Sequence, residues 1–123
     1  MKPLGPVPAG FDAVKGELAI GGQTVSALFE QAGDTPLFVY SQGLITQRIG
    51  DLRRAMPDRL RINYAIKANS FRPVLEHVST LVDGLDIASG GELEMVEAIG
   101  FHLSKVSFAG PGKRDSELEA AIA

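Results

Sequence analysis

A lysine at the end of a strand-like run is the residue of this sequence best placed to do chemistry. Lys67 follows the run 61–66, in which polar and apolar side chains alternate, and the chain turns after it through 68–70. An amine at such a position can lie in a cleft, lose its proton and form a Schiff base with an aldehyde. From this local pattern alone, a simply solvated lysine remains the more common alternative.

Two later strand-like runs also end in polar or glycine-rich turns. The run 85–88 leads into Ser89-Gly90-Gly91-Glu92, and the run 106–109 leads into Gly110-Pro111-Gly112-Lys113. The second turn lacks the spacing of a phosphate-binding P-loop. In parallel α/β folds, chemistry lies at the carboxyl ends of the strands. The sequence therefore predicts that these turns and Lys67 share one edge of a sheet.

Helical patterns separate these strands and predict their direction. The strands end near Ile66, Ala88 and Ala109, 22 and 21 residues apart, with helical stripes of apolar residues between them. Such a βαβαβα series implies parallel strands with right-handed crossovers. A doubly wound sheet and a (β/α)8 barrel both remain open. Since a barrel takes about 250 residues, this chain would supply roughly three of its eight units.

The alternation along the first of these strands also assigns its faces. We expect Ile62, Tyr64 and Ile66 to pack against helices. Arg61, Asn63, Ala65 and Lys67 then lie on the other face, which is the lumen of a barrel. The small side chain of Ala65 leaves room beside Lys67 for a flat ring.

Local signals predict several further elements. The first 35 residues are rich in Pro and Gly and predict a hairpin of strands 11–14 and 17–20, then a helix over 24–31 that ends at Gly33. The run 36–40 predicts a compact strand. Ser41 is expected to cap a helix that ends before Pro57, and Ser116 with Glu119 has capping-box spacing for a last helix.

Composition restricts the class of protein. The chain has 123 residues, 45% hydrophobic and 22% charged, with a net charge of -3 and no cysteine. The charge favours neither nucleic acid nor an anionic membrane surface. The sequence has no apolar run near the roughly 20 residues that span a bilayer, and its start does not resemble a secretion signal. We therefore expect a cytoplasmic protein. No His or carboxylate cluster has metal-ligand spacing, so we expect no metal site.

Three ordered segments resemble one known family. They are Tyr64-Ala65-Ile66-Lys67-Ala68-Asn69, Leu85-Asp86-Ile87-Ala88-Ser89-Gly90-Gly91-Glu92 and Phe108-Ala109-Gly110-Pro111-Gly112-Lys113. In order and spacing they are similar to the N-terminal part of the pyridoxal-phosphate-dependent decarboxylases that share the alanine-racemase-like barrel, which include ornithine, diaminopimelate and arginine decarboxylases. Thr35-Pro36-Leu37-Phe38-Val39-Tyr40 is also typical of that family. The resemblance covers about residues 34–123.

The resemblance implies a fold, a cofactor and a set of site residues. Residues 36–123 would form the first, incomplete part of a (β/α)8 barrel, and residues 1–35 would belong to a second, β-rich domain. Lys67 would carry the Schiff base with pyridoxal 5'-phosphate. Asp86 would lie near that lysine, and Ala65, Ser89 and Glu92 would lie near the cofactor. The full-length protein would be a homodimer that decarboxylates a diaminopimelate-like or ornithine-like amino acid.

Other interpretations compete with these roles. Asp86 alone would be a turn or cap residue, Glu92 suits the first turn of a helix, and Ser89 suits a strand-to-helix turn. A non-catalytic truncated homologue, or a barrel that binds the cofactor without decarboxylating, is the alternative function, and a racemase of the same barrel is a third. Pro6-Val7-Pro8-Ala9-Gly10-Phe11 and the stretch 108–122 resemble a narrower subgroup associated with exosortase and exopolysaccharide systems.

Overall fold

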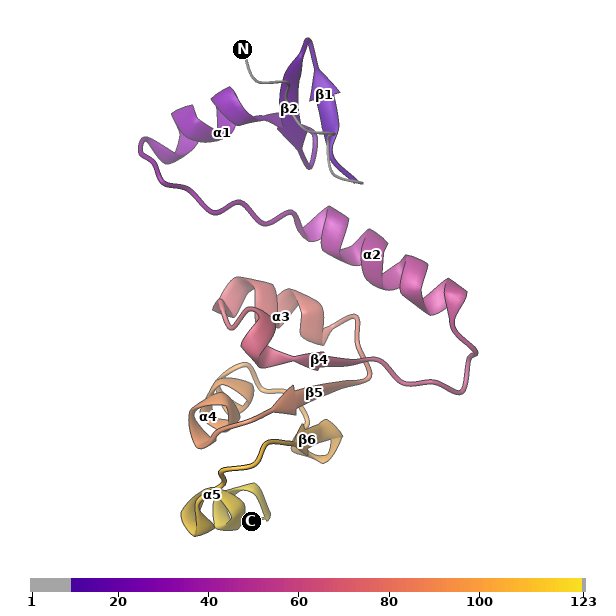
Figure 1. Cartoon of the computed structure of the whole chain (residues 1–123), viewed down its shortest axis with the longest axis vertical. Helices are drawn as coiled ribbons and strands as arrows, with labels where there is room; N and C mark the ends of the chain where they lie inside the picture. The colour runs from indigo at the N-terminus through magenta and orange to yellow at the C-terminus, as the bar shows by residue number, and fades with distance from the viewer. Residues whose placement is uncertain (1–9, 123) are drawn as a thin grey trace. The chain divides into compact units, whose positions relative to one another are not determined.

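The computed structural model describes residues 10–122. They fold as two units, which divide between Ile45 and Thr46. Figure 1 shows the order of the elements along the chain. The predicted domain boundary at residues 35 and 36 stays a prediction. None of the helices formed by the described residues is long and apolar enough to cross a membrane.

The first unit contains the predicted hairpin and helix. Its strands are β1 (Asp12–Val14), β2 (Glu17–Ile20) and β3 (Gln23–Thr24), paired antiparallel in the order β1-β2-β3, and α1 spans Val25–Ala32. The side chain of Thr24 caps α1 by accepting from the Ala27 N–H. Gly33 ends the helix with a φ of 81°, a left-handed conformation that glycine adopts without strain. The predicted hairpin, the helix and its end at Gly33 are confirmed, except that Thr24 caps the helix and does not lie within it.

The compact strand expected at residues 36–40 is not formed. None of the described strands pairs with this segment, and the side chain of Phe38 is 83% exposed. Apolar composition favours a strand only where a neighbouring strand supplies ladder hydrogen bonds. The segment leads into α2 (Gln42–Ala55), and the expected cap is confirmed, because Ser41 Oγ accepts from the Leu44 N–H at 3.3 Å.

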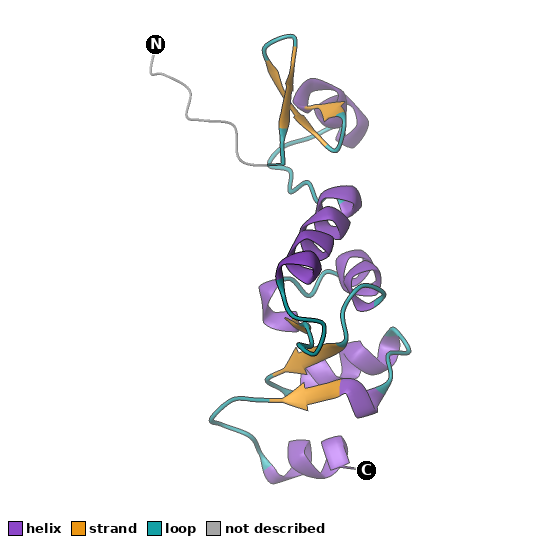
Figure 2. Cartoon of the chain, turned by 90° about the vertical axis from the view of Figure 1, so that its right-hand side faces the viewer, coloured by secondary structure: helices purple, strands orange, loops and turns teal. Residues whose placement is uncertain are grey.

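A parallel sheet with helices between its strands forms the second unit. The strands are β4 (Asn63–Ala65), β5 (Gly84–Ile87) and β6 (Val106–Phe108), in the order β4-β5-β6 with both pairs parallel. The helices α3 (Arg72–Ser79) and α4 (Gly90–Ala98) connect them, and α5 (Asp115–Ile122) follows (Figures 1 and 2). The unit also contains two short 3-10 turns, η1 (Ile66–Ala68) and η2 (Leu103–Lys105), and most of α2. The predicted βαβαβα order is confirmed.

One face of this sheet carries the hydrophobic core. The buried cluster joins Leu85 and Ile87 of β5 to side chains of η1, α3 and α4: Ile66, Leu75, Leu93 and Val96. Tyr64, Val106 and Phe108 pack against it from the neighbouring strands. The alternation within the strands therefore puts one residue in two toward the helices, as the sequence indicated for Tyr64 and Ile66.

Two local expectations need correction. The strand that was expected to reach Ile66 ends at Ala65, so Lys67 lies inside the turn η1 rather than directly after a strand. The last helix does not use Ser116 and Glu119 as a capping box. It begins at Asp115, and Glu117 in its first turn accepts from the Arg114 N–H at 2.9 Å. The helix starts where this carboxylate can satisfy a free N–H group.

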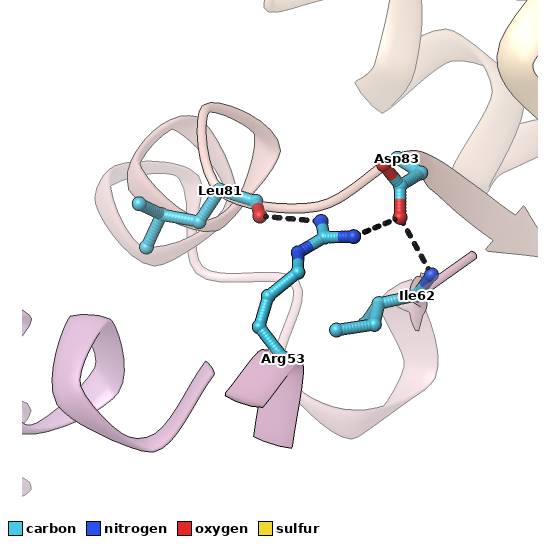
Figure 3. Close-up of polar contacts among 4 residues, drawn as sticks. All are labelled: Arg53, Ile62, Leu81 and Asp83. Atoms are coloured by element: carbon cyan, nitrogen blue, oxygen red, sulfur yellow. Dashed lines mark hydrogen bonds and ion pairs between the residues drawn. The ribbon is translucent and has the colours of Figure 1, made fainter. Parts of the chain in front are cut away.

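An ion pair fixes the amino ends of the strands (Figure 3). Arg53 of α2 donates to Asp83 Oδ2 at 2.7 Å and to the Leu81 carbonyl at 3.2 Å. The same carboxylate oxygen accepts from the Ile62 N–H at 2.7 Å. The Arg53 guanidinium and the Ile62 N–H hold the pKa of Asp83 below its usual range. Asp83 thus joins α2 to the segments that enter β4 and β5.

Candidate functional site

A row of three side chains crosses the face of the sheet opposite the core. In the parallel register Ala65 of β4 pairs with Asp86 of β5, and Asp86 pairs with Ser107 of β6. Side chains at one register level share a face, and the preceding level of each strand supplies the core residues on the other face. The structure therefore brings together a methyl group, a carboxylate and a hydroxyl on the core-free face.

The carboxylate of this row is bonded to its neighbour. Ser107 Oγ donates a hydrogen bond of 2.7 Å to Asp86 Oδ1. Asp86 is half-buried and Ser107 is exposed. Within residues 10–122, the other carboxylate oxygen of Asp86 has no hydrogen-bond or ion-pair partner. Asp86 can therefore accept a hydrogen bond from, or attract, a further cationic group.

Lys67 lies in a turn closed by its neighbours. The Asn69 N–H donates to the Ile66 carbonyl at 3.1 Å, and the hydroxyl of Tyr64 donates to the Asn69 carbonyl at 3.0 Å. The side chain of Asn69 then accepts from the Phe71 N–H at 2.9 Å. Buried Ile66 fastens the turn to the core, whereas Lys67 is exposed. These hydrogen bonds hold the turn, and the Lys67 amine has no partner within residues 10–122.

Asp86 and Lys67 are not joined in this structure. The family resemblance placed Asp86 near Lys67, but no ion pair links them among the residues that the structure describes. The carboxylate is instead bonded to Ser107, which sequence reasoning missed. Asp86 and Lys67 nevertheless belong to neighbouring parts of the sheet. Ala65 of β4 is the register partner of Asp86, and Lys67 comes two positions after Ala65.

Ser89 and Glu92 cap α4. Ser89 Oγ accepts from the Glu92 N–H at 3.2 Å, and the Glu92 carboxylate accepts from the Ala88 N–H at 2.6 Å. The two side chains thus satisfy backbone donors at a helix start, which is the local role weighed against cofactor binding for each of them. This role places both side chains at the carboxyl end of β5.

Glu117 is a residue of this edge that sequence reasoning did not single out. One of its oxygens accepts from the Gly90 N–H of α4 at 2.8 Å, and the other accepts from the Arg114 N–H at 2.9 Å. These two backbone groups hold the pKa of Glu117 below its usual range. Its position in the first turn of α5 was the available signal, because carboxylates there meet free N–H groups.

Other groups at this edge have local partners. Lys113 Nζ donates to the Gly110 carbonyl at 2.8 Å and lies 5.3 Å from the centre of the Phe108 ring. Phe108 packs against the core, so Lys113 is bound on that side of the sheet. Across the described part of the chain, no three His, Asp or Glu side chains are grouped to hold a metal ion. Of the two lysines at this edge, Lys113 is therefore engaged and Lys67 is exposed.

Comparison with protein families gives one match over most of the chain. Residues 42–123 match the family described as "Pyridoxal-dependent decarboxylase, pyridoxal binding domain". The matched segment contains α2, the whole parallel sheet and every residue of the predicted site.

Curated relatives point the same way. The chain is 40% identical over 107 residues to the diaminopimelate decarboxylase of Aquifex aeolicus, covering 87% of this chain and 25% of that protein. It is 39% identical over 115 residues to the diaminopimelate decarboxylase of Pseudomonas fluorescens, covering 91% of this chain and 27% of that protein. The chain thus spans about a quarter of the length of these relatives.

Solved structures share the fold. A crystal structure of an Aquifex aeolicus protein matches with a TM-score of 0.80 and 38% identity, over 91% of this chain and 27% of that one. The diaminopimelate decarboxylase of M. jannaschi matches with a TM-score of 0.73 and 26% identity, over 90% of this chain and 27% of that one. The prediction that the chain forms the N-terminal part of an alanine-racemase-like barrel is confirmed.

Proposed function

Since the chain belongs to the pyridoxal-dependent decarboxylases, whose cofactor is pyridoxal phosphate, we propose that its protein decarboxylates a diaminopimelate-like or ornithine-like amino acid, with Lys67 holding the cofactor as a Schiff base. The observation that carries this proposal is the placement of the Lys67 turn at the carboxyl edge of β4, beside the row that contains Asp86.

The residues at this edge fit the cofactor. Lys67 supplies an exposed primary amine, which is the group that condenses with an aldehyde. Ala65 adds only a methyl group to the row below, so a flat ring meets no bulky side chain there. Asp86 offers a carboxylate with one oxygen open. Together these residues combine a nucleophile, a negative charge and space on one face of the sheet.

The chain's own residues have separable tasks in this reaction. Bound pyridoxal phosphate supplies an electron sink for the carbon that loses CO2. Lys67 would hold the cofactor, and its amine, once released by the substrate amine, could carry a proton on Nζ. Asp86 favours a cation beside it by charge at short range. Ser89 and Glu92 shape the turn at the carboxyl end of β5, from which cofactor contacts would come.

The test is a lysine substitution in the intact protein expressed from its own gene. Lys67→Ala should abolish the visible absorbance of the Schiff base and reduce CO2 release to background, because the nucleophile is lost. Lys105→Ala, at an exposed lysine of η2, is the matched control and should retain both signals. Borohydride reduction followed by peptide mass spectrometry should place the cofactor on Lys67.

The outcomes separate the alternatives. Reduced cofactor found on another lysine would remove Lys67 from this role. A Schiff base on Lys67 without CO2 release from diaminopimelate, ornithine or arginine would identify a barrel that binds the cofactor without decarboxylating these amino acids. Absence of the Schiff base in the unsubstituted protein would support the non-catalytic homologue.

Finer properties of the intact protein are also proposals. We infer a cytoplasmic homodimer from the family resemblance, and light scattering of the purified protein would measure its mass. The association with exosortase and exopolysaccharide systems rests on residues 6–11 and 108–122, of which 6–9 lie outside the described residues. Loss of exopolysaccharide on deletion of the gene would support that association, and unchanged export would contradict it.

A further inference from the structure

We propose that Ser107 is a positioning residue for Asp86, and that its hydroxyl orients the carboxylate toward the cofactor and the Lys67 amine. The inference rests on the proposed function, because Asp86 has a task in binding or reaction only if Lys67 holds the cofactor. It adds a residue from β6 to a site otherwise formed by the ends of β4 and β5.

The geometry of the sheet brings the two side chains together. Asp86 and Ser107 are register partners on adjacent parallel strands, so the ladder fixes the spacing of their backbones. The hydroxyl donates to Asp86 Oδ1 at 2.7 Å, a normal length for such a bond to a carboxylate. An aspartate that otherwise rotates about two side-chain bonds is thereby held in one orientation.

The bond to Ser107 uses only one of the two carboxylate oxygens of Asp86. Oδ1 is engaged by Ser107, while the other oxygen has no partner among the described residues. That oxygen is the one available to a cation or an N–H group of the site. An oriented acceptor loses less freedom on binding than a rotating one, so the Ser107 bond prepares Asp86 before the cofactor arrives.

Packing within the described chain does not explain a serine at this position. Ser107 is exposed and lies on the face opposite the core, whereas its chain neighbours Val106 and Phe108 pack against the core. Serine is not among the residues favoured in strands, whereas valine and threonine are. Its hydroxyl makes one hydrogen bond within the described chain, the bond to Asp86. The side chain thus contributes its polar contact and little else.

A matched pair of substitutions in the intact protein tests the role. Ser107→Thr keeps the hydroxyl, and Ser107→Val has nearly the same shape without it. We expect Ser107→Val to weaken cofactor binding or lower kcat by roughly tenfold or more, as for the loss of a hydrogen bond to a charged group. Ser107→Thr should stay within about twofold of the unsubstituted protein on the same reasoning. Cofactor affinity is read from Schiff-base absorbance, and kcat and KM from CO2 release.

A double substitution distinguishes positioning from general damage. If Ser107 acts through Asp86, Ser107→Val should add no further loss in a protein that already carries Asp86→Ala. Equal behaviour of the Thr and Val variants, or full additivity with Asp86→Ala, would overturn the proposal. If reduction places the cofactor on a lysine other than Lys67, the proposed function fails first, whatever the Ser107 variants do.

Discussion

The two faces of the parallel sheet come from the same three strands but do different work. Toward the helices, Leu85 and Ile87 are fully enclosed with Ile66 in a cluster of aliphatic side chains. On the other face, Asp86 lies between Ala65 and Ser107 and is bonded to a hydroxyl. A step of one residue along β5 therefore moves from the centre of the core to the centre of the candidate site.

This comparison teaches how stability and chemistry are kept apart in a short segment. Burial of the helix-side residues fixes the positions of the strands, and each strand then carries its core-free side chains at a set level. Substitutions on the two faces should therefore change different measured quantities. Core changes should lower the free energy of unfolding, and changes in the row with Asp86 should act on cofactor binding.

The largest stability difference is expected between two adjacent residues of β5. Leu85→Ala should reduce the free energy of unfolding by about 2–5 kcal/mol, because it removes buried methyl groups and leaves a cavity. Asp86→Ala truncates the next residue and should cost about 1 kcal/mol or less, since one hydrogen bond is lost on the core-free face. Urea unfolding of the intact protein measures both.

For cofactor binding the order of the two variants should be reversed, with the larger loss in Asp86→Ala. Asp86→Ala should lower Schiff-base absorbance at limiting cofactor, whereas Leu85→Ala should bind normally under conditions in which it is folded. Equal destabilisation by both substitutions would mean that the two faces are not separated as described.

The sequence predicted the core face well because one local rule decides it. Alternation along residues 61–66 assigned Tyr64 and Ile66 to the helices, and the structure agrees. The spacing of the three strand ends likewise predicted parallel order, since each crossover has room for a helix. Ser41 and Gly33 act at helix ends as the sequence predicted, whereas Thr24 caps the helix in which it was expected to lie.

The contacts of the candidate site and its edge were less predictable because they join distant parts of the chain. The Ser107–Asp86 bond spans 21 residues and depends on register, which alternation alone does not fix. Glu117 bonds Gly90 across 27 residues, and no local signal names that partner. The strand expected at residues 36–40 failed for the same reason: its apolar pattern carries no information on a partner strand.

A smaller loss of stability is expected at Gly84, where neighbouring backbone leaves no room for a side chain on the core-free face. At Gly84, an added Cβ would lie 2.6 Å from Asn63 Oδ1 and 2.6 Å from the Lys105 carbonyl oxygen. Because a backbone carbonyl cannot turn aside, Gly84→Ala should reduce the free energy of unfolding by about 1–3 kcal/mol. The amino end of β5 is thus closed to side chains, in contrast to the level of Asp86.

Gly91 supplies the matched control for this substitution. An added Cβ there meets only Ser89 Oγ at 4.0 Å, and alanine is favoured over glycine in a helix such as α4. Gly91→Ala should therefore leave the free energy of unfolding unchanged or raise it slightly. Thermal unfolding of the two variants side by side measures the difference, and a neutral Gly84→Ala would show that the strands can separate at little cost.

The smallest effect is expected at Asp83. Its carboxylate is bonded to Arg53 and the Ile62 N–H, whereas one oxygen of Asp86 has no partner among the described residues. Arg53 and the Ile62 N–H keep the pKa of Asp83 below its usual range in the folded protein. Its contribution to stability is therefore present above the pKa of the unfolded chain, near 4, and is lost as the pH falls through the lower folded value. Asp83→Asn should lower the free energy of unfolding only modestly at pH 7, because the ion pair is partly exposed.

The difference in free energy of unfolding between Asp83→Asn and the unsubstituted protein should narrow below about pH 4. Asp58→Asn, at an exposed carboxylate with no partner within residues 10–122, is the control and should give no such trend. Urea unfolding at a series of pH values measures both variants, and a gap for Asp83→Asn that widens in acid would show that its carboxylate does not stabilise the amino ends of the strands.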